Sequence, residues 1–219
     1  AAVDEMVVES GATLGLQSSM LLGFRINNGT GTDLTVDGTV INPSSLAWTV
    51  GGTVSFSNGA LYNHNTANGT VPASTWVAGS ECRITGAVNA APSGLGQSFS
   101  DFTWACSGQA SSFNLSGALT TVGRDFTVSS TGTFTLGLTS TSALALTVGR
   151  DFSVSSGSFV TLITGATTSP TAVSMAVTGN VSVTGGGFTV AGGSSSGTGS
   201  VALTVGGTFT NSSSSGTSF

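Results

Sequence analysis

The fold is indicated by one repeat unit, Leu146-Thr147-Val148-Gly149-Arg150-Asp151-Phe152-Ser153-Val154. Similar units recur along the chain. Apolar and polar residues alternate on both sides of the Gly-Arg-Asp centre of this unit. Alternation with a period of two is typical of a half-buried β-strand, and glycine is typical of a tight turn. The stretch therefore predicts two short strands joined by a corner.

Similar units recur at a nearly constant spacing in the second half of the chain. Equivalent positions of this motif are occupied by Phe126, Phe152, Val181 and Phe209. A second aromatic series follows the first in glycine-rich surroundings, at Phe134, Phe159, Phe188 and Phe219. The period is about 26–29 residues, and a nearly fixed period of this size indicates a repeat architecture.

The first half of the chain shows the same period through its tryptophans. Trp48, Trp76 and Trp104 follow one another at two equal intervals that match this period. Applied to the neighbouring residues, the interval places Cys82 level with Val54. The chain is therefore predicted to form one domain, residues 1–219, of seven or eight turns, with a less regular start at 1–30 and the clearest repeats at 118–219.

A turn of about 26–29 residues with three short strands has the size of one coil of a single-stranded parallel β-helix, an all-β fold. Successive coils stack at about 4.8 Å, so equivalent side chains form ladders through the core. Blades of about 40–50 residues exclude a β-propeller, whereas a β-sandwich stays open for residues 1–100. The residues expected in the core ladders are Trp48, Trp76, Trp104, Phe126, Phe134, Phe152, Phe159, Phe188 and Phe209.

Composition fits such a stack and excludes several functions. Only 4 of 219 residues are basic and 9 are acidic, which gives a net charge of −5. A charge repeated in each coil would lie about 4.8 Å from its own copy, so a stack selects against charge. The absence of a basic stripe argues against a nucleic-acid partner. No apolar run is long enough for membrane insertion as a helix.

Several segments resemble large secreted proteins of the Bacteroidota. They are the Tyr62-Asn-His64-Asn segment within 59–76, the Cys82-Arg-Ile-Thr-Gly86 segment, residues 97–106 and the Gly-Arg-Asp-Phe units, so the resemblance covers residues 30 to 219. It implies an extracellular or cell-surface β-helix with an adhesive or structural role, commonly exported by the type IX system. It also implies that the chain is a segment of a longer protein, because the sorting domain expected in that family does not follow.

Residues that carry chemistry are few. Cys82 and Cys106 are the only cysteines, and two alternatives stay open for them, a disulfide or two buried free thiols. His64 is the only histidine, and no nucleophilic serine motif accompanies it, so a place in a surface loop or a ring stacked on Tyr62 is expected and not catalysis. The acidic residues are scattered along the chain, and the Arg124-Asp125 and Arg150-Asp151 pairs are interpreted as structural ion pairs between coils.

Two weaker patterns suggest ligands. Residues 29–37 resemble half of a calcium-binding repeat, but one copy supplies too few carboxylates for a calcium site. Residues 131–135 suggest a hydroxyl face for ice or sugar, although the corresponding positions in other turns vary, so an ordinary solvated face is favoured. No cofactor or metal is therefore expected.

These observations predict a structural or adhesive rod without catalysis, whose partners are flanking solenoid segments or further copies stacked end to end, with a surface glycan as a further candidate partner. The alternative is a protein that binds or degrades carbohydrate on a β-helix. A groove with several convergent carboxylates or aromatic side chains would favour that alternative.

Overall fold

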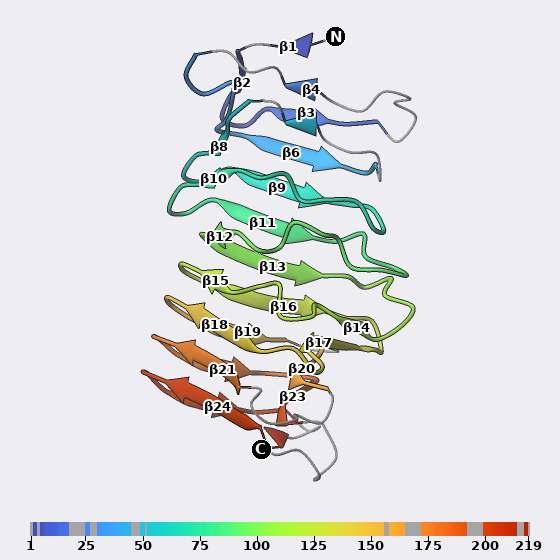
Figure 1. Cartoon of the computed structure of the whole chain (residues 1–219), viewed down its shortest axis with the longest axis vertical. Coiled ribbons are helices and arrows are strands. Elements are labelled where there is room, and N and C mark those ends of the chain that lie inside the picture. The colour runs from blue at the N-terminus through green and yellow to red at the C-terminus, as the bar shows by residue number, and fades with distance from the viewer. Residues whose placement is uncertain are drawn as a thin grey trace.

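The computed structural model describes residues 2–3, 5–17, 25–26, 30–44, 49–50, 52–155, 158–164, 172–191, 199–213 and 217–218. Parallel strands from successive turns stack into long sheets, and the two ends of the chain lie at opposite ends of the stack (Figure 1). The described residues contain strands and turns but no helix. The predicted parallel β-solenoid is thereby confirmed. The described part of residues 1–100 belongs to the same stack, so the β-sandwich alternative for it is wrong.

One sheet runs through the whole molecule and is called the main sheet. Its neighbouring strands are all parallel, from the first pair to the last. Its nine strands are β3 (Thr13–Gly15), β6 (Thr39–Asn42), β9 (Leu61–His64), β11 (Glu81–Ile84), β13 (Asp101–Ala105), β16 (Phe126–Ser130), β19 (Phe152–Val154), β22 (Val181–Val183) and β25 (Phe209–Asn211).

Among the described residues, a second strand precedes the main-sheet strand of each turn, and a third follows it in most turns but not after β9 or β11. The preceding strands form two sheets, β2 (Met6–Val8), β5 (Leu34–Val36), β8 (Val54–Phe56) and β10 (Thr75–Trp76), then β12 (Ser98–Phe99), β15 (Thr121–Val122), β18 (Leu144–Val148), β21 (Ala172–Val177) and β24 (Ser200–Val205). The following strands form two more, β1 (Ala2–Val3), β4 (Arg25–Ile26) and β7 (Thr49–Val50), then β14 (Phe113–Asn114), β17 (Thr135–Thr139), β20 (Phe159–Ile163), β23 (Gly187–Ala191) and β26 (Thr217–Ser218).

Strict alternation along the strands places the apolar residues inside. In β19, Phe152 and Val154 are fully buried and Ser153 points outward. The predicted register of the second half is confirmed, because Phe126 lies opposite Phe152, Phe152 opposite Val181 and Val181 opposite Phe209. Equivalent apolar side chains therefore stack on one another along the axis, which removes their surface from water in every turn.

The length of a turn changes along the molecule. In the main sheet, Val40 lies opposite Tyr62, and Tyr62 lies opposite Cys82. Cys82 in turn lies opposite Phe102, and Phe102 lies opposite Phe126. The separations between these partners are about 20–24 residues, near the lower limit for a structural repeat. The expectation that every turn has the length seen in the second half is therefore wrong for the middle of the chain, where the turns are shorter.

The short turns also overturn the ladder predicted for the tryptophans. Trp76 lies in β10 opposite Phe56, whereas Trp104 lies in the main sheet opposite Ile84. The number of residues between Trp76 and Trp104 exceeds the length of one turn in this part of the chain. The two tryptophans therefore lie in different sheets. The alignment of Cys82 with Val54 fails for the same reason, since Val54 lies opposite Leu34. Trp48 lies outside the described residues.

Each described tryptophan is instead held by a glutamine. The side-chain oxygen of Gln97 accepts a hydrogen bond from the indole Nε1 of Trp76 at 3.1 Å, and Gln109 does the same for Trp104 at 3.2 Å. The side-chain amide groups of both glutamines donate to backbone carbonyls of nearby loops. Buried indole N–H groups are thus satisfied, as buried polar groups must be.

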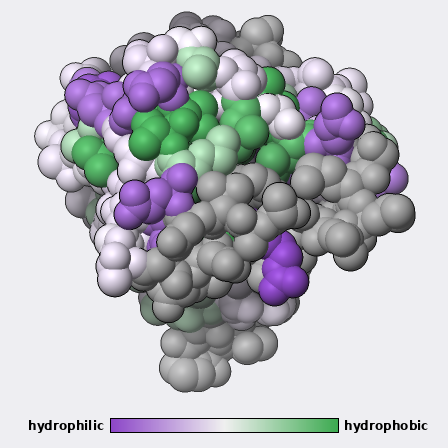
Figure 2. All heavy atoms as spheres, turned by 90° about the horizontal axis from the view of Figure 1, so that it is seen from above, coloured by the Kyte–Doolittle hydropathy of each residue, from purple (hydrophilic) through white to green (hydrophobic). Residues whose placement is uncertain are grey.

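The two end turns expose part of the core. At the C-terminal end, inward-facing residues of β24 such as Leu203 are only partly buried, whereas Met175 in the preceding turn is fully buried. At the N-terminal end, Met6 and Leu14 are partly buried in the same way. Figure 2, which looks onto that end, shows hydrophobic residues gathered between polar ones.

Candidate functional site

Four acidic residues that are far apart in the sequence lie in one outward-facing column beside the main sheet, and we call them the acidic column: Glu81, Asp101, Asp125 and Asp151. Glu81 lies directly opposite Asp101. The carboxylate of Asp101 accepts the backbone N–H of Asp125 at 3.0 Å, and that of Asp125 accepts the N–H of Asp151 at 3.3 Å. The interpretation of the acidic residues as scattered is therefore wrong for these four, because unequal turn lengths bring them into line.

Arginines neutralise most of this column. Arg83 pairs with Glu81 on its own strand at 2.8 Å, and Arg124 approaches Asp101 in the preceding turn at 3.6 Å. Arg150 pairs with Asp125, also one turn back, through two side-chain hydrogen bonds. The predicted pairing between the Arg124-Asp125 and Arg150-Asp151 units is therefore confirmed for Arg150 and Asp125, whereas Arg124 pairs with Asp101, outside those units. The arginine side chains are 37% to 51% exposed, so each pair contributes little stability.

The pKa of Asp125 reflects these contacts. Partial burial raises the pKa of its carboxyl group, but the hydrogen bonds from Arg150 and from the backbone of Asp151 outweigh that effect. The net result is a pKa below the ordinary value of an aspartate. Asp125 is therefore a carboxylate at neutral pH, which suits hydrogen-bond acceptance and not proton donation.

The column ends in neutral residues toward the C-terminus. Asp151 accepts both the backbone N–H and the side-chain amide of Asn180, at 2.7 and 3.1 Å. The side-chain oxygen of Asn180 then accepts the N–H of Thr208 at 2.9 Å. Each of these side chains thus accepts a backbone N–H of the next turn. We call this contact the corner bond, and it is repeated in every turn from Asp101 to Thr208.

A column of hydroxyl groups runs beside the acidic column on the outer face of the main sheet. Its members lie opposite one another in successive strands and are Thr103, Thr127, Ser153, Ser182 and Thr210. Two shallow hollows of about 270 and 400 Å³ follow both columns and share Asp125 and Thr127. Together they form a polar groove parallel to the solenoid axis, which we call the axial groove.

His64 lies away from the axial groove, in the core. Its side chain is fully buried, with Nδ1 3.2 Å from the hydroxyl oxygen of Tyr62 and Nε2 2.7 Å from the backbone oxygen of Asn68. Asn42 donates its side-chain N–H to the same tyrosine oxygen at 3.1 Å. His64 is therefore a satisfied core residue, so the expectation of a surface loop is wrong. Its ring lies beside that of Tyr62, with the centroids 6.1 Å apart and the planes tilted by 45°.

The first aromatic series forms a ladder, and Phe102 extends it by one turn. The ring centroid of Phe126 lies 5.8 Å from that of Phe102 and 5.0 Å from that of Phe152. Phe209, in the last turn, lies opposite Val181 and is only partly buried. The ladder is a packing feature, because inward-facing rings in this series are covered on both sides.

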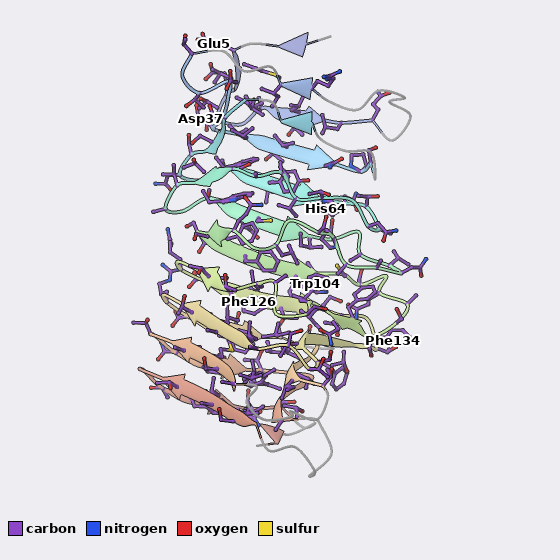
Figure 3. The ribbon with its side chains drawn as sticks, in the orientation of Figure 1. Glu5, Asp37, His64, Trp104, Phe126 and Phe134 are labelled. Carbon is purple, nitrogen blue, oxygen red and sulfur yellow. The ribbon has the colours of Figure 1, made fainter. Side chains whose placement is uncertain are left out.

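The second aromatic series does not form a ladder, contrary to the prediction. Phe159 lies opposite Thr135 and faces partly outward, whereas Phe188 lies opposite Val160 and is fully buried, 5.2 Å from Phe152. A shift of one residue turns a strand side chain to the opposite face. Phe134 is half-buried near the lateral edge of the solenoid (Figure 3), and Phe219 lies outside the described residues.

The cysteines are free and buried, so the disulfide alternative is wrong. Cys82 lies opposite Phe102, and Cys106 follows four residues after Phe102. At about 3.3 Å per residue, this offset places them too far apart along the strand direction for a bond. Burial raises the pKa of Cys82 well above its ordinary value and that of Cys106 to about 11, so neither forms a reactive thiolate at neutral pH.

The two ligand patterns also have structural explanations. Asp33 is buried and accepts hydrogen bonds from the backbone and hydroxyl groups of Thr53. Thr131 is buried and donates to the backbone oxygen of Phe134 at 2.6 Å, so it does not contribute to an outer hydroxyl face. Within the described ranges, no three His, Cys, Asp or Glu residues gather closely enough to hold a metal ion. Glu5 and Asp37 lie near the N-terminal end of the stack (Figure 3).

Comparison with known proteins finds no matching family model, no matching curated protein and no matching solved structure. In the part of the chain that the structure describes, there is no helix with the length and apolar character needed to cross a bilayer.

Proposed function

We propose that this chain is a structural or adhesive module of an extracellular bacterial β-solenoid, a stiff rod or filament building block that performs no catalysis. The observation that carries the proposal is the main sheet, in which every described turn is hydrogen-bonded to the next from β3 to β25. A backbone paired in this way resists bending and offers proteases few open segments. The sequence resemblance to secreted Bacteroidota proteins supports the extracellular location.

The end turns support a role in extension of the rod. Inward-facing residues of β24, among them Leu203, remain partly exposed, and the outer edge of this strand has no strand beside it among the described residues. Exposed strand edges and apolar end faces are usually covered by capping structure or by further strands. We propose that flanking solenoid turns or a second copy stacked end to end cover this face.

Sedimentation velocity over a range of concentrations tests end-to-end stacking. Leu203→Lys places a charge on the end face and is expected to abolish concentration-dependent association. Thr204→Lys is the matched control, because Thr204 lies on the same strand and points outward; this variant is expected to associate like the unmodified chain. An unmodified chain that stays monomeric at all concentrations would contradict self-association and leave flanking turns as the proposed cover.

The axial groove supports a second candidate function, the binding of an extended neutral polysaccharide. Carboxylates and hydroxyl groups recur there once per turn and match the hydrogen-bonding groups of a sugar chain. Hydrolysis would need a carboxyl group with a raised pKa as the general acid. The pKa of Asp125 is lowered instead, which favours binding over cleavage at this position.

A glycan array tests this second candidate. Ser153→Arg fills the axial groove with a long side chain and is expected to abolish any glycan signal, because Ser153 lines the groove. Thr147→Arg, on the exposed face of β18 in another sheet, is expected to retain the signal. The candidate is wrong if the unmodified chain retains no glycan, or if both variants lose the signal equally.

A further inference from the structure

His64 is a core side chain that reaches from the main sheet to the loop that follows its strand. Its Nε2 lies 2.7 Å from the backbone oxygen of Asn68. Asn68 adopts a left-handed conformation with φ of 61°, which non-glycine residues adopt rarely. This conformation turns its carbonyl toward the core, so the loop shape and the histidine contact depend on each other.

The hydrogen bonds define the protonation of the ring. A backbone oxygen only accepts, so Nε2 of His64 must carry a hydrogen and donate it to Asn68. The tyrosine oxygen already accepts from Asn42, and the Tyr62 hydroxyl can therefore donate to Nδ1 at 3.2 Å. A neutral imidazole with an unprotonated Nδ1 satisfies all of these hydrogen bonds.

The segment 65–71, which we call the His64 loop, is stacked on the loop of the next turn. The N–H of Val71 donates to Ser93 at 3.0 Å, and the N–H of Ser93 donates to Gly69 at 2.9 Å. The hydroxyl groups of Thr70 and Ser93 lie 2.8 Å apart. The N–H of Asn68 also donates to Ala90 at 3.4 Å, and the side chain of Val71 is buried at the far end of the segment. The contact with His64 is the hydrogen bond that joins Asn68 to the main sheet.

We infer that His64 is an acid-sensitive latch, whose neutral ring fastens the His64 loop to the solenoid core and whose protonation releases it. Protonation adds a hydrogen to Nδ1, which then faces the tyrosine hydroxyl as a second donor instead of accepting from it. It also places a positive charge at a site with no solvent exposure. Both changes are relieved when the ring and the loop separate and the ring reaches water.

The surroundings contain no charge that would stabilise the protonated ring. Asn42 of β6 and Ile84 of β11 lie on either side of His64 in the main sheet, and neither ionises. The titratable side chains that face this part of the core are Tyr62 on the same strand, Cys82 on β11 and Cys106, whose Sγ lies 3.3 Å from the backbone oxygen of Ile84. All three are buried, burial raises their pKa values, and all three are neutral at pH 7. The loops at 65–74 and 85–97 contain no titratable residue.

The direction of the pH effect follows from burial. Desolvation lowers the pKa of His64 below its ordinary value, and the hydrogen bond to Asn68 offsets this only in part. The released ring has the ordinary pKa of about 6.5. The latch is therefore closed above that pH and opens as the pH falls below it. In that window, the opening equilibrium should increase by about tenfold for each pH unit until the ring protonates in place.

Two measurements on the full chain test the latch. The chain has a single histidine, so the NMR resonance of its imidazole titrates without overlap and is expected to show a midpoint below 6.5. Hydrogen exchange, corrected for its intrinsic pH dependence, is expected to accelerate at Val71 and Ser93 between pH 6.5 and 5. Amides of β16 serve as an internal control and are expected to keep their protection.

A neutral variant separates the latch from a general effect of acid. In His64→Gln the amide can still donate toward Asn68 but does not titrate, so exchange at Val71 should lose its pH dependence. The inference is overturned by a histidine midpoint at or above 6.5, by exchange at Val71 that ignores pH, or by equal acceleration in β16. Because the imidazole titration uses the unmodified chain, a variant that fails to fold does not remove the test.

Discussion

Asp125 connects its own turn to the preceding turn and to the following turn through hydrogen bonds. Its carboxylate accepts hydrogen bonds from the guanidinium group of Arg150 and from the backbone N–H of Asp151, both contributed by the following turn. Its own N–H is accepted by Asp101 of the preceding turn. The ion pair is largely solvent-exposed and contributes little, whereas the bond to the partly buried backbone satisfies a donor that water reaches poorly.

Substitutions at this residue should separate the two contributions. Asp125→Asn keeps an oxygen for the N–H of Asp151 and is expected to change the free energy of unfolding very little. Asp125→Ala removes that acceptor and is expected to cost about 1 kcal/mol more, measured by chemical denaturation at neutral pH. Equal losses in the two variants would show instead that the charge of Asp125 carries its contribution.

The same residue predicts a second acid response, distinct from that of His64. Since the folded pKa of Asp125 lies below its ordinary value, its contribution is present above the unfolded pKa of about 3.9 and is lost as the pH falls further. The latch responds at a higher pH because it depends on a histidine. Two separate steps in acid therefore report on two residues.

At the scale of the strand and its corner, glycine permits the close approach of neighbouring turns. A Cβ atom at Gly179 would lie 2.5 Å from both the backbone oxygen of Arg150 and a carboxylate oxygen of Asp151. A side chain at position 179 would therefore collide with the corner of the preceding turn. At the equivalent position in the preceding turn, Arg150 has room to reach back to Asp125.

Gly179→Ala should therefore destabilise the chain by about 1–3 kcal/mol, the usual range for an overpacked site. Gly15→Ala is the matched control: Gly15 lies at the end of β3, and a Cβ there meets nothing within 4 Å. It is expected to leave stability unchanged or slightly higher. Thermal unfolding of both variants measures the difference, and similar melting temperatures would contradict the role given to Gly179.

Element register was predictable only where the repeat is nearly regular. Phe126, Phe152 and Phe209 belong to units with almost the same sequence, and their alignment follows from spacing alone. Cys82 and Tyr62 lie opposite each other although they share no motif. The acidic column was hidden for this reason, since Glu81 and Asp101 align through a spacing that no repeated sequence marks. The equal spacing of the tryptophans predicted the wrong register, because Trp76 and Trp104 lie in different sheets.

At the scale of the whole molecule, the described strands of each turn pair only with strands of the neighbouring turns, so stability should vary along the axis. The turns of β9, β11 and β13 are covered on both sides and contain large buried rings such as Trp104 and Tyr62. End turns have a neighbour on one side only, and repeat proteins fray from such ends.

Native-state hydrogen exchange should therefore show the slowest amides in β9 to β16 and the fastest in β3 and β25. The comparison needs backbone amides alone and requires no variant. Uniform protection along the axis would indicate a single cooperative unit and contradict the nearest-neighbour interpretation.

The unequal turn lengths have a mechanical consequence. Hydrogen bonds between turns run along the axis, so a pulling force applied at the two ends loads them one turn after another. A turn that detaches releases its chain as slack of about 3.4 Å per residue, which is roughly 70 Å for the shortest turns and roughly 100 Å for the longest. Under tension the chain would lengthen in steps of graded size, with the longest increments from the C-terminal half, and would absorb energy at each step before the rod failed.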